Sequence, residues 1–412
     1  MSSSTTIERT ALQSLKSRTR GDKVIWTAVF LLAIVSLLVV YSSTGLLAYK
    51  MYKGNTEIYL FKQFAFIVVG VGIIYFAHQV NYTIYSRVAT ILFLISIPLL
   101  LYTLFFGVRL NEGSRWIRLP IINMTFQTSD LAKLALFMYL SRQLSKKQEV
   151  IKDFREGFLP VITPVAIICV LIVPANLSTA LLIGATSLML LFIGRVRAKH
   201  LLLTIGVALV PVLILVGAAM VRHSSNGPGG TDRPHAEGHT GLFVRVDTWI
   251  SRVETFMYGA ADNADNNYQT NQAKIAIAKG GFLGLGPGNS QQRNFLPHPY
   301  SDFIYAIIIE EYGMVGAVFI ALVYLVFLLR SIRIFRRCPF AFGAFLALGL
   351  SFTLVIQALA NMAVNVNLFP VTGVTLPLVS MGGSSFLFTC LAIGIILSVA
   401  RNVEQLEGST HE

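Results

Sequence analysis

Long uninterrupted runs of apolar residues constrain this chain more than any other feature of its sequence. Stretches such as Val24–Val40, Leu201–Val221 and Gly316–Leu329 approach or reach the length that crosses about 30 Å of hydrocarbon. Only 13% of the 412 residues are charged, which is about half the charged fraction of an ordinary soluble domain. Because the chain lacks the residues for a soluble surface, the sequence predicts an all-α polytopic membrane protein.

We expect about ten membrane-spanning helices. The first apolar run is too long for the core of a cleavable signal peptide and is followed by further spans, so it counts as a span. The expected spans cover residues 24–44, 60–78, 88–107, 127–141, 158–174, 177–194, 200–221, 303–329, 341–363 and 383–400. The chain therefore divides into a tail (1–22), a transmembrane domain (23–401) and a second tail (402–412). One long outer loop (223–302) separates spans 7 and 8.

The net charge of +13 would suit a nucleic-acid ligand, but its placement favours a role in topology. Segments on the side of the N-terminus carry 19 Lys and Arg residues, against 6 in or directly beside the short loops of the opposite side. Basic residues in short loops stay in the cytoplasm, so we expect both termini to be cytoplasmic. Anionic lipid headgroups are then the nearest partners of these charges, and no nucleic acid is expected.

Asp302 is the first candidate for chemistry. It lies where a polar loop enters the membrane as the span that begins near Phe303. A partly desolvated carboxylate at such a boundary has a raised pKa, which suits proton abstraction. The alternative is an N-cap of the following helix, because Asp before a helix satisfies orphan N–H groups. Glu310 and Glu311 lie two turns deeper in the same span, where adjacent acids need partners.

A second constellation consists of Asp130 and Lys133. Their spacing of three places them on one helix face, where they can pair within the span. We interpret them as a buried structural ion pair that shapes a cavity. A helix start with Asp130 in the first turn and a snorkelling Lys133 is the alternative, and a catalytic role is a third.

Two further segments carry candidate substrate-binding residues. Arg115 could hold a pyrophosphate, because the guanidinium fork matches phosphate oxygens, whereas Trp116 suits an interfacial anchor. The segment Phe369–Ser385 is rich in Pro, Gly and hydroxyl residues, so we expect a re-entrant stretch of irregular backbone that is buried by protein or lines a wet cavity. Asn361 precedes it and could donate hydrogen bonds to a sugar or a carbonyl.

Taken together, these segments resemble the SEDS family (shape, elongation, division and sporulation proteins), whose members include FtsW, RodA and SpoVE. The resemblance covers about Lys23 to Arg401 and is most specific from Gln272 through Gly313. The stretch Gly373–Leu378 resembles the division member FtsW more than RodA. Two departures stand out: Gln127–Asp130 replaces the family's Gln-Pro-Ser-Glu, and Pro174–Thr179 carries Asn176 where the family often has Asp.

The resemblance implies a peptidoglycan glycosyltransferase of the bacterial inner membrane that polymerises lipid II in cell division beside a class B penicillin-binding protein and other division proteins. It implies Asp302 as the catalytic residue and Asp130 with Lys133 as the intramembrane pair. The expected substrate-binding residues are Arg115, Trp116, Arg245, Lys274, Asn361, Ser384 and Ser385. A divalent cation is a candidate cofactor, although no preformed carboxylate cage is visible and we assign no metal ligand.

Two other classes of function remain open on the sequence. A lipid II flippase or another secondary transporter would use charged residues near the midplane of the membrane, such as Asp130, Lys133 and Glu310. A structural recruiter of partner enzymes would depend on no single polar residue. The position of the essential acid distinguishes the first two classes, because a transferase of the outer face needs Asp302 and a transporter needs the midplane residues.

Overall fold

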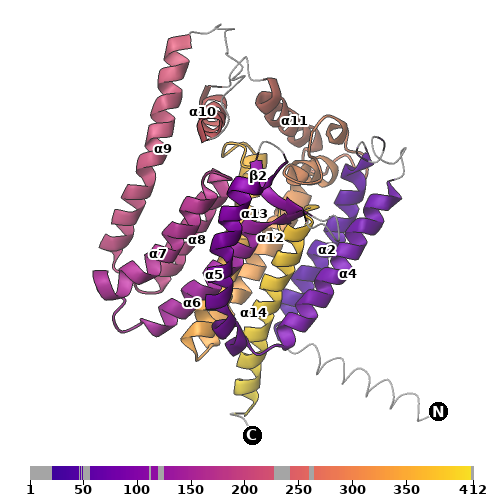
Figure 1. Ribbon diagram of the computed structural model, residues 1–412. Coiled ribbons are helices and arrows are strands. Elements are labelled where there is room, and N and C mark those ends of the chain that lie inside the picture. The colour runs from indigo at the N-terminus through magenta and orange to yellow at the C-terminus, as the bar shows by residue number, and fades with distance from the viewer. Residues whose placement is uncertain are drawn as a thin grey trace, which may run out of the picture.

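The computed structural model describes residues 21–45, 47, 49, 56–110, 113–118, 125–226, 242–258 and 264–409. Long helices form a bundle, and shorter elements gather at one end of it (Figure 1). We call that end the loop end; it carries α10 (Leu242–Tyr258) and α11 (Ala264–Gly280). The opposite end, which carries Gly21 and the last turns of α14 (Ser384–Ser409), is the terminal end.

The helices agree with the expected spans to within a few residues at most boundaries. Among the described residues, eight helices are long and apolar enough to cross a membrane. They are α2 (Lys23–Ser43), α4 (Glu57–Gln79), α5 (Tyr82–Phe106), α7 (Leu159–Ile172) with the π-helical turn Phe154–Phe158 before it, α9 (Ala198–Asn226), α12 (Ile304–Arg337), α13 (Ala341–Asn365) and α14. The other two expected spans are α8 (Leu177–Ile193), which is apolar but short, and α6 (Thr128–Lys146), which contains charged residues. The predicted all-α polytopic fold is confirmed.

Short polar side chains fix where several of these helices begin. The side chain of Asp22 accepts hydrogen bonds from the N–H groups of Val24 and Ile25 at the start of α2. Asn81 caps α5 and Asn176 caps α8 in the same way. Such caps satisfy N–H groups that have no partner inside the helix, so the polar residues between apolar runs set the start of the span that follows.

A small antiparallel sheet at the loop end was not predicted from the sequence. It has the order β1 (Val108–Leu110), β2 (Gly113–Arg118) and β3 (Thr125–Gln127). In its register Trp116 lies opposite Gln127, so the strands join the end of α5 to the start of α6. The strands are too short to give a hydrophobic period that could be recognised in the sequence.

Helix α13 lies at the centre of the bundle, and α9 lies at its edge. Helix α13 packs against α12, α6, α14 and α8, and most of its residues are buried. Helix α9 contacts mainly α10 and α8 and is exposed along most of its length (Figure 1). Large apolar side chains such as Phe76 and Leu213 point outward from the spans, as expected of surfaces that face lipid.

Candidate active site

Asp302 lies in the turn just before α12, at the loop end of the bundle, and is half-buried. Its backbone carbonyl oxygen accepts hydrogen bonds from the side-chain amides of Asn361 (2.9 Å) and Asn365 (3.0 Å), both on α13. Asn365 Oδ1 in turn accepts from the N–H of Ala306 at 3.0 Å. Two turns of α13 therefore hold the peptide of Asp302 in place.

The re-entrant segment holds the same turn from the other side. Ser380 Oγ donates to the carbonyl oxygen of Ser301 at 2.7 Å, and the N–H of Met381 donates to that of Tyr300 at 3.0 Å. Ser301 Oγ donates to Asp302 Oδ1 at 2.9 Å. The backbone on both sides of the carboxylate is thus fixed by contacts distant in sequence, which pre-organises the acid.

The N-cap alternative for Asp302 is wrong. The N-cap residue of α12 is Phe303, so the helix begins one residue later than that alternative requires. Burial raises the pKa of the neighbouring Tyr300 phenol above its ordinary value, and the charge of Asp302 raises it further.

Asp130 and Lys133 form the expected pair inside the bundle. Lys133 Nζ lies 3.4 Å from Asp130 Oδ1, and the two side chains are 14% and 7% exposed. Lys133 also donates to Gln357 Oε1 on α13 at 2.8 Å. Asp130 lies in the first turn of α6, but Lys133 points into the bundle and does not snorkel. The buried-pair geometry is therefore confirmed, whereas its structural role stays a prediction.

A cavity with an empty volume of about 500 Å³ opens beside this pair. Its lining includes Asp130, Lys133, Gln357, Thr375 and Ser385. Asp130 Oδ2 is buried and has no hydrogen-bond partner in the described part of the chain. A buried carboxylate oxygen without a partner is costly, so this cavity is suited to a polar group or a water molecule.

The irregular segment between α13 and α14 links the cavity to Asp302. Gln357 Nε2 donates to the carbonyl oxygen of Thr375 at 3.0 Å, and Asn361 Nδ2 donates to that of Val374 at 2.7 Å. Leu376, Leu378 and Val379 of this segment are buried. Residues 376–380 of the segment are therefore irregular backbone buried by protein, as predicted for a re-entrant stretch, whereas Phe369 at its start is exposed. Side-chain amides of α13 supply the donors that water cannot supply there.

Glu310 and Glu311 fasten the outer loop to α12. The Glu310 carboxylate is fully buried and accepts hydrogen bonds from Ser290 Oγ and from the N–H groups of Gln291 and Gln292. The Glu311 carboxylate accepts from Ser42 Oγ at the end of α2. These acids thus have the partners that the sequence required of them: those of Glu310 belong to the loop that leads to Asp302, and Ser42 belongs to α2.

Close backbone packing explains the glycine run at 280–288. Helix α12 is broken at Gly313, which has φ 66° and ψ −166°, and the N–H groups of Leu285 and Gly286 donate to the carbonyl oxygens of Glu310 and Glu311 at 2.9 Å each. A Cβ on Gly284 would lie 2.2 Å from the carbonyl oxygen of Glu311. The glycines therefore serve close approach of loop and helix.

The other predicted substrate-binding residues are spread over the loop end. Trp116 is partly buried on β2, and Ser384 Oγ accepts from the N–H of Gln127 at 3.2 Å, next to the sheet. Lys274 is exposed on α11. Arg115 lies on β2 and Arg245 on α10, but their side chains lie outside the described residues. The structure thus joins Asn361 to Asp302 and Ser385 to the Asp130 cavity.

Three residues that support these groups were not identified from the sequence: Gln357, Ser380 and Arg293. Gln357 had a recognisable signal, because Gln357, Asn361 and Asn365 recur every four residues on an apolar helix and share one face. Arg293 donates to Ser42 Oγ at 3.1 Å and to the carbonyl oxygen of Gly288 at 2.9 Å; no local pattern predicts these contacts. Within the described ranges, no group of three or more His, Cys, Asp or Glu residues could hold a metal ion.

Curated relatives match almost the whole chain. "Probable peptidoglycan glycosyltransferase FtsW" of Geobacter sulfurreducens is 30% identical over 401 residues, which cover 95% of this chain and 98% of the relative. "Stage V sporulation protein E" of Bacillus subtilis is 31% identical over 389 residues, which cover 93% and 98%.

Solved structures share the fold. A chain of "Structural coordination of polymerization and crosslinking by a peptidoglycan synthase complex" matches with a TM-score of 0.67 and 22% identity, over 93% of this chain and 99% of that one. The rod shape determining protein RodA of Thermus thermophilus matches with a TM-score of 0.60 and 20% identity, over 93% and 97%. Finally, the sequence profile FTSW_RODA_SPOVE, described as "Cell cycle protein", matches residues 22–405. The profile covers the ten expected spans and both polar centres, namely the turn that carries Asp302 and the cavity beside Asp130 and Lys133. The chain therefore belongs to the FtsW/RodA/SpoVE family, the SEDS proteins.

Proposed function

We propose that this protein is a peptidoglycan glycosyltransferase that polymerises lipid II on the outer face of the bacterial inner membrane, in cell division. Relatives named for this activity are about 30% identical over nearly the full length. The observation that carries the proposal is the half-buried carboxylate of Asp302, whose backbone is held by Asn361, Asn365 and Ser380. Such a fixed acid at a membrane boundary suits a general base.

In the proposed reaction, the 4-hydroxyl oxygen of the acceptor sugar attacks C1 of the donor disaccharide. The bond from C1 to the α-linked pyrophosphate breaks, and the lipid pyrophosphate leaves with the bonding electron pair. The proton of the hydroxyl passes to the carboxylate of Asp302, and the new linkage is β because the displacement inverts C1. A positioned base contributes roughly 10²–10⁴-fold to such a step.

The leaving pyrophosphate needs cationic donors at the loop end. Arg115 and Arg245 are the proposed donors, since arginine forks bind phosphate oxygens in pairs, and Lys274 on α11 adds an exposed ammonium group. Trp116, Asn361, Ser384 and Ser385 complete the proposed substrate contacts. The charge distribution supports a topology with both termini in the cytoplasm, and the family supports a class B penicillin-binding protein as the partner that provides crosslinking.

A lipid II transporter is the second candidate, and the cavity beside Asp130 and Lys133 favours it. A polar cavity next to a buried ion pair, with one carboxylate oxygen that no described residue bonds, is what an ion or substrate path through the membrane requires. The two candidates differ in the acid on which they depend, so one experiment separates them.

That experiment compares polymerisation and transport in the same preparations. The protein is purified alone and with its class B penicillin-binding protein, whose transpeptidase serine is replaced, and labelled lipid II is added. We expect glycan ladders from the wild type and from Glu254→Gln, a control that removes another loop-end carboxylate, and none from Asp302→Ala or Asp302→Asn. Normal ladders from Asp302→Asn would refute the general base. If no glycan ladders formed and lipid II crossed the membrane of liposomes that contain the protein, the transporter would be established.

A further inference from the structure

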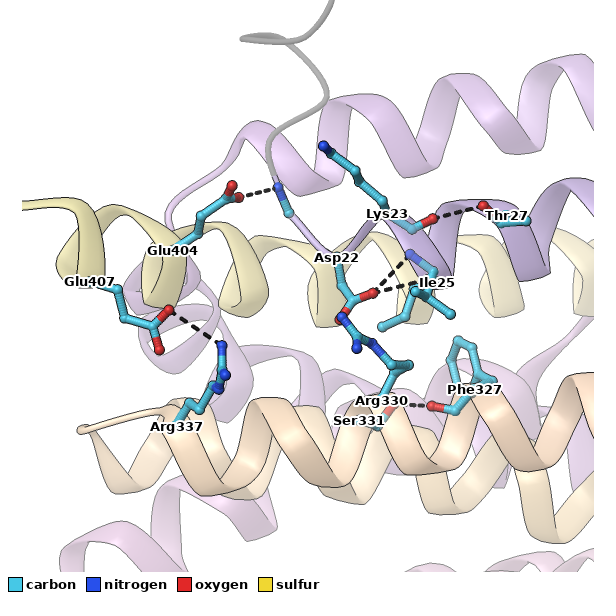
Figure 2. A network of polar contacts seen from close by, with 12 residues as sticks. Asp22, Lys23, Ile25, Thr27, Phe327, Arg330, Ser331, Arg337, Glu404 and Glu407 are labelled. Atoms are coloured by element: carbon cyan, nitrogen blue, oxygen red, sulfur yellow. Dashed lines mark hydrogen bonds and ion pairs between the residues drawn. The ribbon is translucent and has the colours of Figure 1, made fainter.

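A polar clasp joins three helices at the terminal end (Figure 2). Asp22, the cap of α2, also accepts from Arg330 of α12, whose Nε and Nη2 both lie 2.7 Å from Asp22 Oδ2. On α14, Glu404 accepts from the N–H of Gly21 at 2.7 Å, and Glu407 lies 3.5 Å from Arg337 Nη1. The clasp therefore connects the start of α2 to the last turns of α12 and α14.

A cavity with an empty volume of about 980 Å³ opens at this clasp. Part of its wall is apolar and consists of Val24, Ile334, Ala400 and Val403; the last three are buried. The charged part consists of Asp22, Lys23, Arg330, Arg333, Arg337, Glu404 and Glu407. The cavity is thus amphipathic and lies where helices leave the membrane.

The charges of the wall do not cancel. Arg330, Arg333 and Arg337 follow one another at spacings of three and four, so they share one face of α12. Asp22 engages Arg330, Glu407 engages Arg337, and Glu404 is bound to the N–H of Gly21. Arg333 and Lys23 also line the cavity, and neither has a side-chain hydrogen bond or ion pair to any residue that the structure describes. Arg333 and Lys23 are therefore the cationic side chains of the wall without such a side-chain contact to a described residue, and with Glu404 counted the wall carries one more positive than negative charge.

The geometry points to a binding site for the phosphate headgroup of an anionic phospholipid. The headgroup phosphate would pair with Arg333 and Lys23, because neither side chain is paired with a described residue and guanidinium groups bind phosphate oxygens in pairs. The apolar wall accommodates the glycerol and the first acyl carbons, which a soluble phosphate lacks. Basic pockets between helices at a membrane surface bind such headgroups, and nothing in the proposed glycosyl transfer uses this end of the molecule.

The test measures phosphatidylglycerol bound to the purified full-length protein by native mass spectrometry, with phosphatidylcholine as the zwitterionic reference, whose phosphate is balanced by its own cation. Each basic residue near a membrane surface contributes a binding free energy whose loss weakens binding about fivefold. We expect that loss from Arg333→Gln and from Lys23→Gln, and about 25-fold from the double variant. Arg336→Gln is the matched control, because Arg336 is exposed on the same helix turn but does not line the cavity; it should bind as the wild type does.

An equal loss from Arg336→Gln would mean diffuse attraction and would overturn the site, as would unchanged binding by Arg333→Gln. Inorganic phosphate that displaced the lipid at millimolar concentration, with the same dependence on Arg333, would assign the cavity to a free anion instead. A photoactivatable phosphatidylglycerol on the wild type makes the test independent of variant folding. We expect crosslinks in 330–337 and 400–407, and crosslinks elsewhere alone would refute the proposal.

Discussion

Tyr300 reports on the charge of Asp302. Burial and the carboxylate both raise the pKa of the Tyr300 phenol, in that order of importance. Replacing Asp302 by Asn removes the second cause, because a phenolate no longer faces a negative charge. We therefore expect the pKa of Tyr300 to fall in Asp302→Asn but to stay above 10.0, since burial remains.

The measurement is a pH titration by NMR with ¹³Cζ-labelled tyrosine, in which Tyr300→Phe identifies the signal. Glu254→Gln serves as the control and should leave the titration unchanged. A pKa that stays constant or rises in Asp302→Asn would show that the two side chains are not coupled, and the placement of the carboxylate beside the phenol would be wrong.

The Asp130–Lys133 pair allows a test of structural against chemical roles. Lys133→Met leaves the buried Asp130 without its cation, which costs about 3–5 kcal/mol of stability for a pair of this burial. The double variant Asp130→Asn, Lys133→Met removes both charges and should recover most of that loss. Thermal unfolding in detergent measures the difference, and Lys152→Met, at an exposed position, provides the control.

Equal destabilisation in the single and double variants would contradict a structural pair. Polymerisation by the double variant adds a second criterion. A folded double variant that retains most of its activity supports the structural role, whereas a folded and inactive one assigns the pair to chemistry or transport. Asp130 Oδ2 has no hydrogen-bond partner among the described residues, and this oxygen in the cavity makes the second criterion necessary.

At the scale of elements, the outer loop and α12 depend on glycine at their contact. Gly284 and Gly288 both have positive φ values, +82° and +78°, but only at Gly284 would a Cβ meet backbone atoms within 4 Å. Alanine at either position costs about 1–2 kcal/mol for the left-handed conformation. In Gly284→Ala the added Cβ would in addition push the loop away from the break in α12.

We therefore expect Gly284→Ala to lower the unfolding midpoint and the rate of polymerisation clearly more than Gly288→Ala does. Both are measured by thermal unfolding and by glycan ladders from labelled lipid II. Similar behaviour of the two variants would show that the close approach of Gly284 to Glu311 does not govern the loop.

The sequence predicted the spans well because the length of an apolar run is a local property. The pairing of Asp130 with Lys133 was also predictable, since a spacing of three defines one helix face. The partners of Glu310 were not, because Ser290 reaches it only once the loop folds back on a broken helix. For Asn361 the sequence predicted a hydrogen bond to a sugar or a carbonyl without saying which, and the acceptor is the peptide carbonyl of Asp302; its role in substrate binding stays a prediction.

At the scale of the molecule, α12 and α13 connect the polar centres. Helix α13 carries the Gln357–Asn361–Asn365 ladder from the Asp130 cavity to Asp302. Helix α12 holds the loop through Glu310 at one end and the clasp through Arg330 at the other. The proposed site for chemistry and the proposed lipid site therefore lie at opposite ends of one membrane-spanning helix.

The orientation of the whole molecule decides which of these ends meets lipid II. The excess of Lys and Arg at the terminal end, 19 against 6, predicts that this end lies in the cytoplasm. In a chain without Cys169, Cys338 and Cys390, a membrane-impermeant maleimide should label Phe282→Cys, whose parent side chain is 72% exposed at the loop end, in intact spheroplasts. Arg336→Cys should react only after permeabilisation. The reverse pattern would place Asp302 in the cytoplasm, where it could not polymerise glycan on the outer face.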